Sequence, residues 1–255
     1  MTSTTFSGSS DAYERFMGRY SRLLAHSFAD FAGVTEGMRV LDVGAGTGAL
    51  TDELISRAGI GNVAALEPSP DYSSALGERL PGLDVRQARA ESLPWDDASF
   101  DCVLSQLVAV FLEDAPAAMR EQLRVLREGG IAATCMWELE GLEMFRALNA
   151  VRQRLDPNPP AVRGEYRSEQ SLRELFESAG FRDVETSVLE TAVEHETMDE
   201  LWDAAIHVGG PGGAMADSRS PEQLAEGRIV FGELLGNPSG SFTLRGRAAA
   251  VRGVR

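Results

Sequence analysis

The residues with the clearest chemical meaning are three glycines that follow the first predicted strand. The apolar segment Arg39–Val43 runs into Gly44, Gly46 and Gly48, which are spaced two apart and precede a helical pattern. Glycine has no Cβ, so the chain can turn sharply here while its backbone approaches a ligand closely. The pattern therefore predicts a cofactor-binding turn, and a plain tight turn is the alternative.

Two acidic residues narrow the choice of ligand. Asp42 lies directly before the first glycine, where the pyrophosphate of a dinucleotide would rest, and a carboxylate there repels phosphate and favours a cation. Glu67 ends the next apolar segment, about twenty positions after the glycines, where a carboxylate can accept hydrogen bonds from both hydroxyls of a ribose. The two acids favour an adenosine ribose joined to a positively charged, phosphate-free group, as in S-adenosylmethionine.

A nicotinamide-dependent oxidoreductase is a second interpretation of the same loop. Residues Gly44–Ala49 also satisfy the loose Gly-x-Gly-x-x-Gly/Ala fingerprint of dinucleotide-binding proteins. The position of Asp42 argues against that ligand.

Composition limits the class of protein and its partners. The 255 residues, 43% of them hydrophobic, can form one large α/β domain with its own core. The net charge of −15 opposes a nucleic-acid substrate and favours a small molecule. We expect no membrane span, signal peptide or metal site, and a cytoplasmic protein with Cys102 and Cys135 as reduced core thiols. The oligomeric state does not follow from the sequence.

The hydrophobic patterns predict alternating strands and helices. Five apolar strands separated by helices indicate a parallel sheet with right-handed crossovers. The expected strands are 39–43, 63–67, 83–87, 100–105, 131–137, 181–193 and 241–251. The expected helices are 11–31, 49–59, 70–80, 115–128, 142–155, 168–179, 199–208 and 221–235.

We expect a single domain over residues 1–255. Its parts are an N-terminal helical lid at 11–36, a cofactor-binding core at 37–140, a cap insertion at 141–170 and a completion of the sheet at 171–255. The cap would follow the fifth strand, above the carboxyl ends of the strands, where ligands of such sheets bind.

Several blocks, in order and spacing, resemble the class I S-adenosylmethionine-dependent methyltransferases, in particular the bacterial small-molecule branch similar to the ubiquinone/menaquinone type. The resemblance covers about residues 11–190 and implies a Rossmann-like α/β fold: seven strands, mostly parallel with the last antiparallel, helices on both faces, and a partial helical lid. The matching blocks are Leu41–Gly48, Leu66–Ser69, Ala90–Trp95, Ser99–Asp101, Arg124–Gly130 and Ala179–Phe181.

The resemblance also implies roles for single residues. Residues Asp42 to Gly46 would line the methionine part of the cofactor, Glu67 would hold the ribose, and Gln106 would face the sulfonium. Around the adenine we expect Pro68, Ala90 and Glu91. The N-terminal helix could cover the ligand, so the full set of expected cofactor-binding residues is Tyr13, Met17, Tyr20, Asp42, Gly44, Ala45, Gly46, Glu67, Pro68, Ala90, Glu91 and Gln106.

Three positions depart from the pattern of this branch. Arg89 replaces an Asp that binds the adenine amino group in many relatives, Val110 replaces a frequent His, and Glu128 replaces a Pro. The branch's candidate base is therefore missing. His207, near a glycine-rich segment, is our candidate catalytic residue, and His26, His195 and Glu138 are further ones.

The sequence thus predicts methyl transfer from S-adenosylmethionine to a small, apolar or aromatic acceptor. An acceptor pocket could include Tyr13, Phe16, Tyr20, Phe111, Trp137 and Tyr166. Methyl transfer does not always need a base, because the sulfonium already activates the carbon and alignment of the reactants supplies much of the rate enhancement. The alternatives are a protein that binds the cofactor without methylating, as a sensor or for a rearrangement, and the oxidoreductase.

Overall fold

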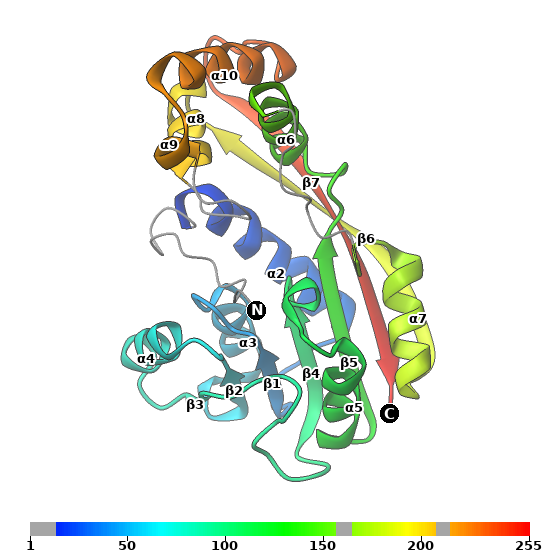
Figure 1. Cartoon of the computed structure of the whole chain (residues 1–255). Coiled ribbons are helices and arrows are strands. Elements are labelled where there is room, and N and C mark those ends of the chain that lie inside the picture. Colours follow the sequence, from blue (N-terminus) through cyan, green and yellow to red (C-terminus); the bar gives the residue numbers. More distant parts are fainter. Residues whose placement is uncertain (1–13, 157–164, 208–214) are drawn as a thin grey trace. The chain divides into compact units, whose positions relative to one another are not determined.

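The computed structural model describes residues 14–156, 165–207 and 215–255, and these contain a seven-stranded sheet (Figure 1). The strand order is β3-β2-β1-β4-β5-β7-β6. Strands β1 to β5 pair in parallel, and β7 pairs antiparallel with β5, which confirms the predicted mostly parallel sheet with an antiparallel last strand. The strands are β1 Val40–Val43, β2 Val63–Leu66, β3 Asp84–Arg86, β4 Phe100–Gln106, β5 Leu126–Trp137, β6 Arg182–His195 and β7 Phe242–Val254.

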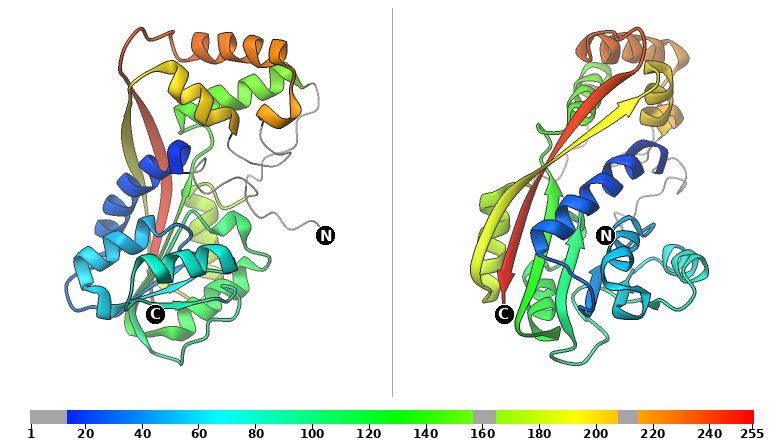
Figure 2. Two further views of the ribbon diagram at one scale, coloured as in Figure 1. Left: turned by 90° about the vertical axis from the view of Figure 1, so that its left-hand side faces the viewer. Right: turned by 180° about the vertical axis from the view of Figure 1, so that it is seen from behind.

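Helices follow the strands in the order that the sequence predicts, and Figure 2 shows helices on both faces of the part of the sheet that β1 to β5 form. A π-helical turn, Glu14–Gly18, leads into the first α-helix. The α-helices are α2 Arg19–Ala32, α3 Ala49–Ala58, α4 Pro70–Arg79, α5 Ala115–Val125, α6 Glu143–Leu155, α7 Glu169–Ala179, α8 Met198–His207, α9 Met215–Ser218 and α10 Pro221–Leu234.

The chain divides into two compact units. The first unit comprises residues 1–20, 138–164 and 190–247, and the second comprises 21–137, 165–189 and 248–255. Strands β6 and β7 contribute residues to both units. The single domain with a lid at 11–36 and a cap at 141–170 stays a prediction, because those ranges do not coincide with the boundaries of the units.

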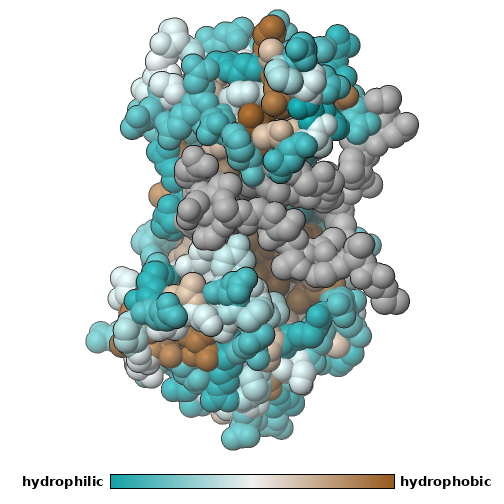
Figure 3. Space-filling view, turned by 60° about the vertical axis from the view of Figure 1, so that its left-hand side comes forward, coloured by the Kyte–Doolittle hydropathy of each residue, from teal (hydrophilic) through white to brown (hydrophobic). Residues whose placement is uncertain are grey.

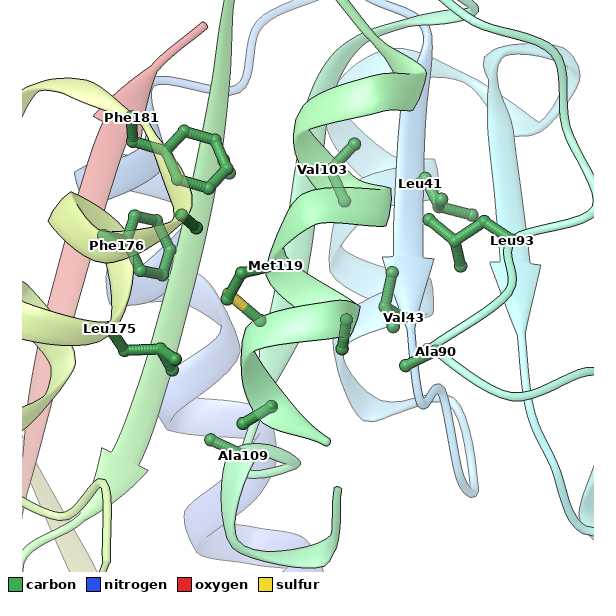
Figure 4. Close-up of a cluster of buried hydrophobic side chains, with 14 of the residues drawn as sticks. Leu41, Val43, Ala90, Leu93, Val103, Ala109, Met119, Leu175, Phe176 and Phe181 are labelled. Carbon is green, nitrogen blue, oxygen red and sulfur yellow. The ribbon is translucent and has the colours of Figure 1, made fainter. Parts of the chain in front are cut away.

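The second unit holds a large apolar cluster between the sheet and helices α5 and α7 (Figure 4). Leu41, Val43 and Val103 project from β1 and β4 toward this cluster. Phe176 of α7 stacks on Phe181, with ring centroids 4.7 Å apart. This packing fixes β1 and β4, whose carboxyl ends carry the predicted site.

The first unit packs α6 against α8 and α10. A Cβ at Gly227 of α10 would lie 3.0 Å from Val151 of α6 and 3.0 Å from Trp202 of α8, so the helices approach closely because that position has no side chain. Trp202 also contacts Phe231, with ring centroids 5.3 Å apart. These contacts give the first unit its own small core.

Local sequence signals explain the helix that follows β2. Ser69 caps α4, because its hydroxyl accepts the Tyr72 N–H at 3.5 Å, and Pro70 occupies the first turn, where a missing N–H costs nothing. The predicted start of this helix at residue 70 is confirmed.

The end of α5 was predicted wrongly. The sequence predicted a helix over residues 115–128, whereas the helix ends at Val125 and β5 begins at Leu126. Leu126 pairs with Phe100 of β4, and the Gly129 N–H donates to the Arg255 carbonyl at 3.3 Å. Pairing with distant segments therefore overrides the local helical pattern.

Hydrophilic side chains dominate the described surface in the view of Figure 3, in keeping with the high net charge. Within the described ranges, none of the helices combines the length and apolarity needed to cross a bilayer. Cys102 and Cys135 are free and buried in β4 and β5, as predicted for core thiols.

Gln122 is an unexpected polar residue in the core and provides a test of the packing. It lies on the buried face of α5, and neither atom of its amide has a hydrogen-bond partner in the described part of the chain. Gln122→Met keeps the length of the side chain and removes the buried polar atoms, so we expect the free energy of unfolding to rise by about 1–3 kcal/mol. Urea denaturation measures this.

The matched control is Gln170→Met on the exposed face of α7, for which we expect a change within about 0.5 kcal/mol. A loss of stability in Gln122→Met would contradict the interpretation and indicate that the amide is satisfied in solution.

Candidate functional site

The predicted glycine loop bends back onto the end of the neighbouring strand β2. The N–H groups of Gly44 and Ala45 both donate to the Leu66 carbonyl, at 2.8 and 3.0 Å. Gly44 has a φ of 79°, and a Cβ there would lie 2.6 Å from a methyl group of Val108. Gly46 has a φ of 55° and open space where a Cβ would stand. The loop therefore exposes bare backbone at Gly46 and is packed tightly at Gly44.

Glu67 links this loop to the loop after β2. One oxygen of its carboxylate accepts the Gly46 N–H at 2.8 Å, and the other accepts the Ser69 N–H at 2.9 Å. The side chain is only 6% exposed, and burial raises its pKa, which the hydrogen bonds from Ser69 and Gly46 oppose. Each carboxylate oxygen retains a lone pair, so Glu67 can still accept one hydrogen bond from each of two hydroxyl groups.

Asp42 is the second buried carboxylate of the loop. It is 1% exposed at the end of β1, and the Thr51 hydroxyl of α3 donates to it at 2.6 Å. Burial raises the pKa of Asp42 to about 7, the hydrogen bond from Thr51 lowers it, and the nearby Glu67 raises it. The site therefore carries two buried acids whose negative charge a cation would stabilise.

Gln106 ends β4 on the face of the sheet that also carries Asp42. Its amide nitrogen donates to the Ser21 carbonyl of α2 at 3.0 Å. Its amide oxygen and the Ser21 hydroxyl are buried and have no hydrogen-bond partner among the described residues. These unpaired atoms mark a place where a polar ligand group could bind.

The residues expected around the adenine lie on the loops after β2 and β3. Pro68 is exposed, and Ala90 is buried against the apolar cluster, as Figure 4 shows. The Glu91 carboxylate accepts the N–H groups of Glu113 and Asp114 just before α5, at 2.9 and 3.4 Å. The Glu91 side chain therefore fixes this loop to the residues before α5.

Arg89, which replaces an acid of the related pattern, is held by carboxylates. Its guanidinium lies 3.0 Å from the Glu113 carboxylate and 3.5 Å from that of Glu91. The adenine contacts expected of Pro68, Ala90 and Glu91 stay predictions.

The expected N-terminal residues belong to the first unit, apart from Tyr13, which lies outside the described residues. Met17 and Tyr20 are buried, and the Tyr20 hydroxyl is 2.8 Å from Nε2 of His195. Burial lowers the pKa of His195 to about 4, and Arg19 adds to that shift, so the imidazole is neutral at physiological pH. Burial also raises the pKa of Tyr20. The cofactor contacts predicted for this helix stay predictions.

The candidate bases are divided between the two units. His207 is exposed at the end of α8 in the first unit, where its ring contacts the Asp203 carbonyl at 2.7 Å. His26 lies on α2 in the second unit, 3.0 Å from the Glu53 carboxylate. Glu138 lies in the first unit, 3.6 Å from the Arg247 guanidinium. A catalytic role for any of them stays a prediction.

The aromatic residues expected around the acceptor are divided between the units. Phe16 and Tyr20 belong to the first, and Phe111, Trp137 and Tyr166 belong to the second. Trp137 is buried at the end of β5, and Phe111 is exposed. A common acceptor pocket stays a prediction.

Three site residues escaped the sequence analysis. Thr51 holds Asp42, Ser21 lies beside Gln106, and Leu107 follows β4 with a φ of 64°. Thr51 lies three residues after Gly48, in the first turn of the helix that follows the loop, so its spacing from the glycines could have identified it. The other two depend on tertiary packing, for which the sequence offers no pattern. Among the described residues, no three His, Cys, Asp or Glu side chains are grouped to hold a metal ion.

Comparison with known proteins agrees with this geometry. A family model described as a methyltransferase domain matches residues 41–134. A relative from Idiomarina loihiensis, the ubiquinone/menaquinone biosynthesis C-methyltransferase UbiE, is 37% identical over 116 residues, which are 43% of this chain and 46% of that protein. The match thus spans about half the length of the curated relatives.

Solved structures share the fold at low identity. Phosphoethanolamine N-methyltransferase 2 of Haemonchus contortus, solved with S-adenosylhomocysteine, superposes with a TM-score of 0.57 at 18% identity, over 96% of this chain and 56% of that one. The (4+2)-cyclase SpnF superposes with a TM-score of 0.53 at 20% identity, over 92% of this chain and 80% of that one.

The raised pKa of Asp42 predicts a dependence of stability on pH. Its pKa of about 7 in the folded state exceeds the ordinary 3.8, so the folded protein binds more protons than the unfolded chain between about pH 4 and 7. The contribution of Asp42 to stability therefore falls as the pH rises through that window, by at most about 1.4 kcal/mol per pH unit.

Asp42→Asn removes this titration and leaves an oxygen that can accept from Thr51. We expect the variant to gain stability over the wild type as the pH rises from 5 to 7 and the difference to level off above about pH 7.5. Urea denaturation of both proteins at a series of pH values measures the difference. A difference that does not change with pH would contradict the raised pKa.

Proposed function

This chain belongs to the class I S-adenosylmethionine-dependent methyltransferases, and from that premise we propose that it transfers the cofactor's methyl group to a small-molecule acceptor. The observation that carries the proposal is the pair of buried carboxylates, Asp42 and Glu67, around an open glycine loop at the ends of β1 and β2. That arrangement suits an adenosyl group that bears a positive charge.

The residues present fit S-adenosylmethionine. Open space at Gly46 leaves room for the ligand against the backbone, and Glu67 has the acceptor capacity to take both ribose hydroxyls. Asp42, whose burial disfavours its charge, gains from a nearby cation. We therefore propose Asp42, Gly44, Ala45, Gly46 and Glu67 as the central cofactor-binding residues.

The cofactor supplies an electrophilic methyl group, and the protein's part is to bind and align. Well-oriented reactants can lower a barrier by roughly 7–11 kcal/mol relative to free solution, provided that the reacting atoms lie about 3–3.5 Å apart. The rigid loops at the ends of β1, β2 and β4 supply that alignment here. Their hydrogen bonds to Leu66, Glu67 and Cys135 limit movement of the backbone.

A small acceptor is favoured by the charge of the protein. A net charge of −15 repels nucleic acid over long range, and the curated relative UbiE is named for a step in quinone biosynthesis. We also propose a cytoplasmic location, which the two free, buried cysteines support.

The second candidate is a protein that binds the cofactor without transferring its methyl group. Two observations support this candidate. The chain superposes with SpnF, which is named as a cyclase, and Val110 occupies the position where relatives often have a histidine. A label transfer assay separates the two functions.

The deciding experiment is incubation of the purified protein with methyl-labelled S-adenosylmethionine and a metabolite extract, after native mass spectrometry for bound ligands. Label in a new small molecule supports the proposal and identifies the acceptor class. Tight cofactor binding without any transfer would favour the non-methylating function, and a bound dinucleotide would overturn both.

Gly46→Val tests the loop. We expect it to abolish binding of S-adenosylmethionine, because the side chain would fill the open space beside the backbone. Gly37→Val is the matched control, since Gly37 also has a positive φ, 79°, with open space at its Cβ, and lies before the opposite end of β1. Calorimetric titration measures binding, and retained micromolar affinity in Gly46→Val would contradict the loop assignment.

Glu67→Gln tests the ribose site. The loss of a charged acceptor is expected to weaken S-adenosylhomocysteine binding by about 1–3 kcal/mol, or roughly 5- to 150-fold. A 2′,3′-dideoxy analogue separates ribose binding from any disturbance of the loop, because the variant should bind it as well as the wild type does. Equal losses for both ligands would show that Glu67 acts only through the loop.

A further inference from the structure

Two buried polar atoms of the second unit have no partner within the protein. They are the amide oxygen of Gln106 and the hydroxyl of Ser21, and neither makes a hydrogen bond with another described residue. The two side chains are neighbours, because the Gln106 amide nitrogen donates to the Ser21 carbonyl at 3.0 Å. Buried polar atoms of this kind are normally paired, so these two call for a partner from outside the protein.

The register of the sheet places this pair near the cofactor loop. Asp42 lies opposite Leu104 in the parallel pairing of β1 with β4, and Gln106 is two residues further along β4. Gln106 therefore shares the face of Asp42, and strand geometry puts their Cα atoms about 8 Å apart. The carboxamide of Gln106 therefore lies one strand away from the carboxylate of Asp42, on the side opposite to Glu67.

The segment after Gln106 is held against the glycine loop. Leu107 adopts a φ of 64°, which is costly for a residue with a Cβ, and its N–H donates to the Cys135 carbonyl at 2.9 Å. The next residue, Val108, then packs on Gly44. The backbone that carries the carboxamide is therefore fixed relative to the cofactor loop, as the positioning of a reactant requires.

We propose that the Gln106 amide oxygen and the Ser21 hydroxyl form the polar end of the acceptor site and accept the N–H groups of a primary amine. This inference rests on the proposed methyl transfer and specifies its acceptor class. If Glu67 holds the ribose and Asp42 lies by the cationic part, the ligand runs from β2 to β1, and β4 is the next strand on which the acceptor can meet it.

The chemistry of an amine matches the two unpaired atoms. Two N–H groups held by two oxygens leave the nitrogen lone pair directed away from both, toward the methyl group. The lone pair forms the new N–C bond while the C–S bond breaks, and its electrons remain on sulfur as a neutral thioether. The product is an N-methylammonium ion, which loses its proton to water.

Other acceptor atoms fit these residues less well. A carbon nucleophile offers no N–H or O–H group and would leave both oxygens buried and unpaired. A hydroxyl has to lose its proton, and neither a carboxamide nor an unactivated serine takes one at neutral pH. A neutral amine needs no base, in keeping with Val110 at the position where relatives often have a histidine.

A bisubstrate amine tests the pair without knowledge of the acceptor. In this analogue of S-adenosylmethionine a nitrogen replaces the sulfur and carries a 2-aminoethyl arm, so its primary amine lies beyond the methyl position, where the acceptor nitrogen would be. We expect the wild type to bind the bisubstrate amine at least about ten-fold more tightly than S-adenosylhomocysteine in calorimetric titrations, because charge-assisted hydrogen bonds add to its affinity.

Three variants connect that preference to the two residues. We expect Gln106→Met and Ser21→Ala to reduce affinity for the bisubstrate amine several-fold more than they reduce affinity for S-adenosylhomocysteine. Gln106→Glu keeps an acceptor and should retain the preference, which guards against a simple loss of folding. Gln170→Met, an exposed amide on α7, is the control without effect.

Each outcome decides the inference. An unchanged preference in Gln106→Met and Ser21→Ala, or no preference in the wild type, would overturn it and leave the pair with a buried water only. Label found on oxygen or carbon of a methylated product would also overturn it while the proposed methyl transfer stands. If the wild type bound neither ligand, the cofactor site itself would be refuted, and this inference with it.

Discussion

The carboxylate of Glu67 is the interaction on which the geometry of the site depends. It accepts the N–H of Gly46 on one side and the N–H of Ser69 on the other, and so joins the loops that follow β1 and β2. Without it, the glycine loop would keep the hydrogen bonds of Gly44 and Ala45 to Leu66, but Gly46, its most open residue, would lose its anchor. The same two oxygens are the acceptors available to a ribose. The Glu67 side chain therefore both holds the loops in place and can bind the ligand.

The site is built at a cost in stability. Asp42 and Glu67 are two buried acids whose pKa values are raised by loss of solvation, and the charge of Glu67 raises the pKa of Asp42 further. A fold selected for stability alone would avoid such a pair. A bound cation would stabilise the charged form of both carboxylates. The unfavourable electrostatic energy of the free protein would therefore increase its affinity for a positively charged ligand.

Sequence reasoning was most accurate where the physical signal is local. The turn at the three glycines, the start of α4 at Pro70 and the strand before Glu67 follow from spacing and residue type, and the structure confirms them. The end of α5 was wrong because pairing of Leu126 with Phe100, and of Gly129 with Arg255, overrides a helical pattern. Ser21 and Leu107 could not be identified because their importance depends on contacts with segments far away in the chain.

A crystal structure with S-adenosylhomocysteine tests the central claim most directly. The account predicts that both ribose hydroxyls donate to the Glu67 carboxylate at hydrogen-bond distance and that the ligand lies against the Gly46 backbone, with Asp42 beneath the loop. An empty loop in crystals that contain saturating ligand, or a ribose bound away from Glu67, would contradict it.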